Sequence, residues 1–263
     1  MKAKCVNLTA NPHSCLSDYI ECYSYRKISV EKGDKLVKTM PHRISTSLDF
    51  YLGARHKTIQ TTTLQEAAYY RCGVRGYRTF SKYTIEIEDL FRSFTVKFKP
   101  GGFYALFGIP LSEFTNQDLP LEELGILPAK EILERLCRLD NVAEMKAVLE
   151  EYLLRIISNR KIREFTLHFP DYLTNVDELA SCYGKSIRQL ERMYNYYIGL
   201  GPKAFHNLHR FQYLLHLRKQ YPYENWTMLG YRADYFDQSH LIKDFKSYLN
   251  ITPSHFDPSL FAF

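Results

Sequence analysis

The stretch of sequence that decides the fold of the C-terminal part reads Asn175-Val-Asp-Glu-Leu-Ala-Ser-Cys-Tyr-Gly184-Lys-Ser186-Ile-Arg188-Gln189-Leu190-Glu191-Arg192-Met-Tyr194. The same local pattern returns as Trp226-Thr-Met-Leu229-Gly230-Tyr-Arg-Ala-Asp234-Tyr235-Phe236-Asp237-Gln238-Ser239-His240-Leu241-Ile-Lys243-Asp-Phe245-Lys246. In each copy, a short capped helix precedes a tight turn and a second helix with basic and amide side chains on one face. A helix of this size fits the major groove of B-DNA. The two copies therefore predict tandem helix-turn-helix units that read duplex DNA.

Local signals in the first copy support this interpretation. Asn175 and Ser186 are each followed three residues later by Glu or Gln, which is the spacing of a capping box at a helix start. Gly184 stands between the two helices, where a turn with positive φ costs glycine little. A small core is expected from the apolar residues of the copy, which are Leu179, Ala180, Ile187, Leu190 and Met193. The polar residues of the second helix are then left to face outward.

A longer helix is expected to connect the two copies. Gly201-Pro202 places proline at the first helical position, and Lys203 to about Gln220 follows with one apolar side. The opposite side carries His206 and His209, whose spacing could hold a metal. Because a third ligand is not evident, we expect a solvated or phosphate-facing surface instead. Further on, Asp237 is expected to cap a helix over residues 238–249 whose inward stripe is Leu241, Phe245 and Leu249, and Thr252-Pro253 is expected to cap a short closing helix containing Phe256.

Together these residues resemble the AraC/XylS-type transcriptional regulators over roughly residues 160 to 257. The most specific pieces are Leu179-Ala180 with Ser186, Leu190 and Arg192, then Gly201-Pro202, Asp237-Gln-Ser-His240, Phe245-Lys246 and Thr252-Pro253. The resemblance implies two helix-turn-helix subdomains on a linker helix, with both recognition helices in successive major-groove segments of one DNA face. At positions that usually meet bases it places Arg188, Glu191 and Arg192, then Gln238, Ser239 and Lys243. The expected DNA-binding set is Lys185, Ser186, Arg188, Gln189, Glu191, Arg192, Phe236, Gln238, Ser239, His240, Lys243 and Lys246.

Three positions depart from the family pattern. Asp234 stands where glycine is usual in the second turn, and aspartate tolerates left-handed backbone better than most residues. Gly230 stands where alanine is usual, which is expected to loosen that helix slightly. His168-Phe-Pro170-Asp interrupts the segment expected to form the first helix. The N-terminal part, including Phe98-Lys-Pro-Gly-Gly, is similar to a domain that often precedes such pairs in uncharacterised regulators.

The first 115 or so residues predict a β-rich region. Its candidate strands are rich in aromatic and β-branched residues and are bounded by Gly or Pro; they are Asp18–Tyr25, Ser45–Leu52, Ala68–Gly76, Tyr83–Ile87 and Ser93–Phe98. Phe103–Phe107 could be a buried strand or a helix start. The aromatic residues of this region could line a ligand pocket or form core; they are Tyr69, Tyr70, Tyr77, Phe80, Tyr83, Phe103, Tyr104 and Phe107.

From about Leu119 the apolar period becomes helical, and Asn141–Ile157 is strongly amphipathic. That helix could pack on the β-rich region or present its apolar stripe to a second copy of the chain. The expected fold class is therefore an α+β domain over residues 1–158, β-rich with following helices, and an all-α domain over residues 159–263 with two helix-turn-helix units joined by a linker helix.

Composition limits the function classes. The chain has 263 residues, a net charge of +6 and 45% hydrophobic residues, which is typical of a globular protein. Its six cysteines are scattered without zinc or redox spacing, as expected for reduced thiols in the cytoplasm. No apolar run is long enough to span a membrane, and Met1–Pro12 lacks a signal-peptide core. His42 and His56 lack metal-type spacing, and no nucleophile motif is found, so neither a cofactor, a metal nor an enzyme activity is expected.

The sequence thus predicts a sequence-specific DNA-binding transcriptional regulator whose N-terminal domain senses a signal or sets the oligomer. The expected partner is double-stranded promoter DNA; RNA polymerase, a small-molecule effector in the N-terminal domain and a second copy of the chain are further candidates. Two alternatives stay open. One is an interaction or scaffold protein whose DNA-binding pair has decayed, motivated by Asp234 and the modest charge. The other is an enzyme domain targeted to DNA.

Overall fold

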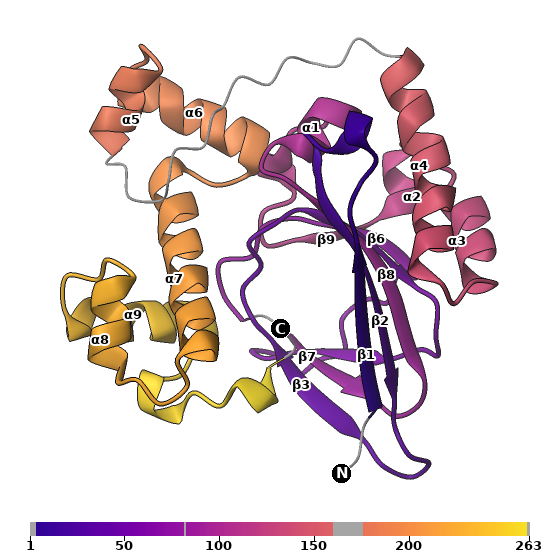
Figure 1. Cartoon of the computed structure of the whole chain (residues 1–263), viewed down its shortest axis with the longest axis horizontal. Helices are drawn as coiled ribbons and strands as arrows, with labels where there is room; N and C mark the ends of the chain where they lie inside the picture. Colours follow the sequence, from indigo (N-terminus) through magenta and orange to yellow (C-terminus); the bar gives the residue numbers. More distant parts are fainter. Residues whose placement is uncertain (1–3, 82, 160–175, 262–263) are drawn as a thin grey trace.

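The computed structural model describes residues 4–81, 83–159 and 176–261. Figure 1 shows a β-rich N-terminal domain with helices α2, α3 and α4 on one side and the C-terminal helices α5 to α9 on the opposite side. The expected fold class, a β-rich domain with following helices and then an all-α domain, is confirmed. The stretch His168-Phe-Pro170-Asp and the cap expected at Asn175 lie outside the described residues.

The larger sheet of the N-terminal domain has six antiparallel strands. In spatial order they are β1 (Lys4–Ala10), β2 (Ile20–Ser29), β8 (Phe91–Phe98), β4 (Ser47–Tyr51), β6 (Cys72–Arg75) and β9 (Asp118–Pro120). The central strand β8 alternates between buried and partly exposed residues along most of its length, as a strand with one covered face does. The smaller sheet has the order β3 (Leu36–Met40), β7 (Tyr83–Ile87) and β5 (Lys57–Gln60).

Helices complete the N-terminal domain. They are η1 (Ser14–Leu16), α1 (Gly102–Phe107), η2 (Leu111–Glu113), α2 (Leu121–Leu124), α3 (Ala129–Cys137) and α4 (Val142–Asn159). The segment Phe103–Phe107, for which strand and helix were both open, is helical and buried. The helix α4 buries Met145, Leu149 and Leu153 in the core that the six-stranded sheet supplies. Packing on the β-rich domain, one of the two expected roles of this helix, is therefore confirmed.

The C-terminal helices follow the expected pattern. They are α5 (Val176–Cys182), α6 (Ile187–Ile198), α7 (Pro202–Gln220), α8 (Trp226–Arg232), α9 (Gln238–Leu249), η3 (Pro253–His255) and η4 (Pro258–Leu260). Their apolar faces form one core with Leu190, Phe211 and Phe245 fully buried. The expected division after residue 158 falls beside the last residue of α4 and remains a prediction.

Candidate nucleic-acid interface and ligand cavity

The first helix-turn-helix unit is built by α5, a turn and α6. Gly184 in the turn has a φ of 58°, the left-handed conformation that the sequence predicts. The Ser186 side chain accepts a hydrogen bond from the Gln189 N–H, and the Gln189 side chain accepts one from the Ser186 N–H. This reciprocal capping box satisfies two backbone donors at the start of α6. Buried Leu179 and Leu190 hold the two helices together.

The N-terminal half of α6 presents its polar side chains to solvent. All of the expected contact residues of this unit are exposed; they are Lys185, Ser186, Arg188, Gln189, Glu191 and Arg192. The side chains of Ser186 and Gln189 are partly engaged, because they bond to each other in the cap. Ile187, expected in the small core, is instead 43% exposed, so that expectation was wrong. As the first residue of the helix, Ile187 lies beside the cap rather than over the packed stripe.

The second unit repeats this construction with α8 and α9. Asp234 in its turn has a φ of 59°, so the aspartate keeps the left-handed turn, as expected. The Asp237 side chain accepts a hydrogen bond from the His240 N–H at 2.7 Å and caps α9. A Cβ atom on Gly230 would lie 2.8 Å from Cδ1 of Leu241, which is closer than van der Waals contact. Gly230 therefore allows α8 and α9 to approach, a role that the sequence interpretation did not include.

The exposed face of α9 carries most of the expected contact residues. Phe236 is 87% exposed just before the helix, and Ser239, Lys243 and Lys246 are also exposed. Gln238 is exposed, but its side-chain amide donates a hydrogen bond to Thr227.

His240 differs from the other expected contact residues, because it belongs to a polar network that links α7 to α9. Arg210 on α7 donates from Nη2 to His240 Nε2 at 2.8 Å and to Asp244 Oδ2 at 3.3 Å. The Tyr235 hydroxyl donates to the same Asp244 oxygen at 2.9 Å. The sequence interpretation missed Asp244, although its position three residues after Leu241 places it near the inward stripe. The network fixes α9 on the connecting helix.

Two histidines on α7 are not where the sequence interpretation placed them. His206 is only 8% exposed, and its ring lies 5.7 Å from that of Phe205. His209 lies 4.2 Å from the same ring, and burial lowers its pKa to about 4. The expected solvated or phosphate-facing surface was therefore wrong for both residues, because this side of α7 is covered.

The N-terminal domain covers that side of α7. Tyr77 is buried in the same core as the C-terminal helices, and its ring lies 5.9 Å from Phe205. His42 places Nε2 3.0 Å from Oε1 of Gln212, midway along α7. The end of α6 also contacts this domain, since the Thr115 hydroxyl donates to the carbonyl of Gly199.

Tyrosine and tail contacts complete this interface. The Tyr104 ring of α1 packs edge-on against Tyr197 of α6 at 4.8 Å. At the other end, Phe261 forms an isolated parallel bridge with Thr39 of β3. The β-rich domain therefore touches α6, α7 and the tail that follows α9.

Arg78 is a buried cation whose charge acts on His42. It is 3% exposed, and no described acidic residue forms an ion pair with it. Its Nε and Nη1 atoms contact no hydrogen-bond partner among the described residues. The guanidinium lies over the Tyr83 ring at 5.3 Å, while burial lowers the pKa of Arg78 to about 10. Burying a charge without a counter-charge is costly, so the structure holds this group against its solvation preference.

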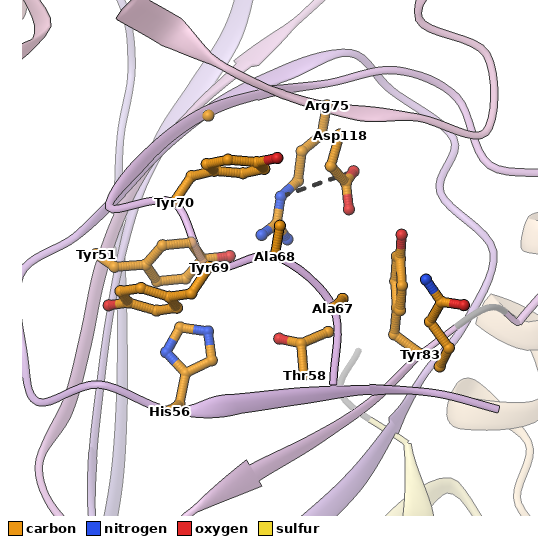
Figure 2. Close-up of a pocket in the computed structure, with 12 residues that line it drawn as sticks. Tyr51, His56, Thr58, Ala67, Ala68, Tyr69, Tyr70, Arg75, Tyr83 and Asp118 are labelled. Atoms are coloured by element: carbon orange, nitrogen blue, oxygen red, sulfur yellow. Dashed lines mark ion pairs between the residues drawn. The ribbon is translucent and has the colours of Figure 1, made fainter. Parts of the chain in front are cut away.

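A cavity of about 180 Å³ opens between the two sheets of the N-terminal domain. Figure 2 shows tyrosine rings around it, with Arg75 and Asp118 pointing into it from one wall and His56 from the opposite wall. The lining includes three of the aromatic residues that the sequence left open between pocket and core; they are Tyr69, Tyr70 and Tyr83. Of the others, Tyr77, Phe103 and Phe107 are buried in core clusters.

Charged groups alternate in sign beside the cavity. Asp49 Oδ2 lies 3.3 Å from Arg43 Nη1 and 3.5 Å from Arg75 Nε, and Arg75 Nε lies 3.8 Å from Asp118 Oδ1. Burial would raise the pKa of Asp49, but Arg75 and Arg43 hold it below its usual value. Burial would lower the pKa of Arg75, but Tyr51, Asp118 and Asp49 keep it above the ordinary value. Asp49 and Arg75 are therefore both charged near neutral pH.

The histidine of the cavity is uncharged near neutral pH. His56 is buried against Tyr51, with ring centroids 4.5 Å apart, and its Nδ1 has no partner among the described residues. Burial, aided by the charge of Arg75, lowers the pKa of His56 to about 4. His56 therefore contributes a polar but uncharged surface to the cavity.

Within residues 4–81, 83–159 and 176–261, no group of three or more His, Cys, Asp or Glu side chains is placed to hold a metal ion. Among the same residues, no helix has the length and apolar character needed to cross a bilayer.

These elements define a class of architecture in which a β-rich domain precedes two helix-turn-helix units on one connecting helix. Residues 8–120 match the family described as a domain of unknown function, DUF6597. Among solved structures, the chain is similar to ToxT from Vibrio cholerae, at 11% identity over 91% of this chain and 99% of that chain with a TM-score of 0.46. Unsaturated fatty acid-bound ToxT from Vibrio cholerae strain SCE256 gives 9% identity over 90% and 95%, with a TM-score of 0.48.

A further structural match is the AraC-like transcriptional activator CuxR. The identity is 11% over 86% of this chain and 90% of that chain, with a TM-score of 0.29. An AraC-like protein is thus among the structures that this chain resembles. No curated protein matches the chain.

Proposed function

We propose that this protein is a sequence-specific DNA-binding transcriptional regulator in which α6 and α9 enter successive major-groove segments of one duplex. The supporting observation is that the two helices have the same construction. Each has a capped start, a buried inner stripe and an exposed polar N-terminal half, and both are fixed to the single helix α7. A rigid pair of this kind would read an asymmetric site of about two helical turns per monomer, because the two units differ in sequence.

The exposed side chains have the chemistry that base reading needs. Arg188 and Arg192 can each donate two hydrogen bonds to guanine, and Glu191 can accept one from cytosine N4. On α9, Lys243 and Lys246 can donate to guanine or to phosphate. His240 is the weakest member of the expected set, because its Nε2 is already occupied by Arg210.

The first experiment is a selection of binding sites from a random duplex library with the full chain, followed by affinity measurements on the selected site. Arg192→Ala and Lys243→Ala should each weaken specific binding by about 1–3 kcal/mol if the residue contacts a base. A residue that contacts only phosphate should instead reduce the salt slope by roughly one unit and leave sequence preference unchanged.

Lys130→Ala is the matched control for these variants, because Lys130 is an exposed lysine on α3 of the other domain. It removes one positive charge without touching either helix-turn-helix unit. The proposal fails if no site is selected at low salt, or if both recognition-helix variants bind the selected site as tightly as Lys130→Ala does.

Control by the N-terminal domain is part of the proposal. It is supported by the contacts of that domain with α6, α7 and the tail after α9. A small-molecule effector in the cavity, a homodimer, RNA polymerase as a partner and action in the cytoplasm complete the proposed picture. A direct repeat or palindrome among the selected sites would indicate the dimer.

A further inference from the structure

We propose that the cavity of the β-rich domain binds a small zwitterion, with its carboxylate on the guanidinium of Arg75 and its ammonium group beside the carboxylate of Asp118. A compact α-amino acid or a betaine has this chemistry. Binding itself is independent of DNA reading; only its use as a regulatory signal rests on the proposed function. The argument depends on four features of the cavity, which are its loose ion pair, its charge balance, its aromatic wall and its size.

The loose ion pair is the first feature. Arg75 Nε and Asp118 Oδ1 are 3.8 Å apart, which is longer than an N–H···O hydrogen bond. Both side chains nevertheless point into the same space (Figure 2). A cation and an anion that stand side by side without bonding tightly each keep hydrogen-bonding capacity for a third group. A ligand that carries an anionic and a cationic group at a similar separation would bond to Arg75 with the first and to Asp118 with the second.

The charge balance of the wall is the second feature. Of the residues that line the cavity, Arg75 and Asp118 carry opposite charges, and His56 adds none near neutral pH. A ligand with a net charge would leave an uncompensated charge in a site partly shielded from solvent, which is costly. A ligand that carries one charge of each sign keeps the balance. A neutral polyol would also keep it, but would not use the full charges of Arg75 and Asp118.

The aromatic wall offers the ring of Tyr70 to a cationic group. Arginine guanidiniums already lie over the other three lining tyrosines, Tyr51, Tyr69 and Tyr83, and among the described residues none lies over Tyr70. The negative face of an aromatic ring attracts ammonium and quaternary ammonium groups within about 6 Å. The rings also give an apolar surface to the carbon body of a ligand. A cavity of about 180 Å³ leaves room for a molecule of roughly amino-acid size and little more.

The test is isothermal titration calorimetry of the full chain with defined probes. The panel holds the common α-amino acids and glycine betaine, and each amino acid is matched with its deaminated acid and its decarboxylated amine. Alanine, for example, is compared with propanoate and ethylamine. We expect at least one zwitterion to bind and both of its matched analogues to bind at least tenfold more weakly. Neutral monosaccharides form a separate arm.

Asp118→Asn separates the ammonium contact from the rest of the site, since it keeps the shape and removes the charge. The variant should bind the best amino acid at least tenfold more weakly while its affinity for the deaminated acid does not fall. Glu66→Gln is the matched control, because Glu66 is an acid of the same domain that pairs with Arg55 at 2.9 Å and does not line the cavity. A thermal unfolding scan shows whether each variant is folded.

If Asp118→Asn does not fold, Tyr70→Ala serves in its place, because Tyr70 lines the cavity and is partly exposed, so its loss leaves little empty core. It should weaken the zwitterion by at least tenfold. The proposal is overturned if no zwitterion binds, if the deaminated acid or a monosaccharide binds as tightly, or if the folded variant keeps the affinity of the parent. None of these readouts uses DNA, so a failed site selection and a failed titration are distinguishable.

Discussion

His42 occupies an unusual position for a titratable residue. It lies between the domains, with its ring against Phe211 at 5.2 Å and its Nε2 bonded to Gln212. Burial lowers its pKa from 6.5 to about 4; the bond to Gln212 opposes this shift, whereas Arg78 and His209 add to it. The folded protein therefore binds a proton at His42 less readily than the unfolded chain does.

This difference predicts how stability depends on pH. As the pH falls from about 6.5 toward 4, the unfolded chain takes up a proton at this position that the folded chain refuses. The free energy of unfolding should fall in that window by a slope approaching about 1.4 kcal/mol per pH unit for this histidine alone. His42→Gln should flatten the curve by nearly one proton in urea unfolding measured across the window. Parallel curves for variant and parent would show that the histidine is not buried between the domains.

Several single residues were predictable because their chemistry is local. Gly184, Asp234 and the cap at Asp237 have the conformations that the sequence predicts, since turns and helix starts depend on neighbouring residues. The covered positions of His206 and His209 were not predictable in this way. His209 lies against Tyr77, which is more than a hundred residues away in the chain, and His206 lies against Tyr194 of the preceding helix.

The end of α6 shows how one element is held by another domain. Gly199 has a φ of 88°, and a Cβ atom there would lie 2.5 Å from the carbonyl oxygen of Leu111 in η2. Gly184, at the other end of α6, has a similar left-handed φ of 58° but no atom within 4 Å of the added Cβ. The two glycines therefore differ in their surroundings while sharing a backbone conformation.

Alanine at the two positions separates backbone strain from crowding. Gly184→Ala should cost about 1–2 kcal/mol of unfolding free energy, which is the cost of left-handed backbone for an L-residue. Gly199→Ala should cost clearly more, because the backbone must also move away from Leu111. Urea unfolding of the two variants gives both numbers. Equal losses would contradict the close contact between α6 and η2.

Among the elements, strands were predicted where they are central and missed where they are at an edge. The strand Tyr83–Ile87 has the predicted bounds, and β2, β4, β6 and β8 overlap the predicted segments. The strand β1 was missed although Val6-Asn-Leu-Thr-Ala10 alternates apolar and polar residues; as an edge strand it is mostly exposed and supplies little of the core. The strands β3 and β5 were also missed. Both are short, mostly exposed strands at the edges of the smaller sheet.

At the scale of the whole molecule, Arg75 and Arg78 lie three residues apart and have opposite electrostatic environments. Arg75 forms ion pairs with two carboxylates, Asp49 and Asp118, whereas the buried Arg78 forms none among the described residues and feels Asp118 only at longer range. Removing an uncompensated buried charge is tolerated far better than removing one member of a buried pair.

Methionine at the two positions should therefore give opposite results. Arg75→Met should lose about 3–5 kcal/mol of unfolding free energy, because Asp49 and Asp118 are left without their shared cation. Arg78→Met should be as stable as the parent or more stable by about 1–2 kcal/mol. Urea unfolding at neutral pH checks both variants. A loss at Arg78→Met as large as that at Arg75→Met would mean that a counter-charge for Arg78 exists.

The arrangement of the domains was the part that the sequence could not reveal. Helix periodicity and caps predict each helix-turn-helix unit separately, because those signals are local. The docking of Tyr77 and His42 on α7 depends on tertiary contacts between segments without a shared motif. The cavity was foreseen only as a set of aromatic residues, since its ion pair joins β6 to β9 across the sheet.

Arg78 belongs to two surfaces at once. Its guanidinium covers the ring of Tyr83, which lines the cavity, and its charge acts on His42, which bonds to α7. Under the proposed function, a side chain shared in this way would link occupancy of the cavity to docking of the helices. Linkage is reciprocal, so the factor by which an occupant changes the affinity for DNA equals the factor by which DNA changes the affinity for that occupant. Titrating either molecule in the presence of the other then measures one and the same coupling free energy.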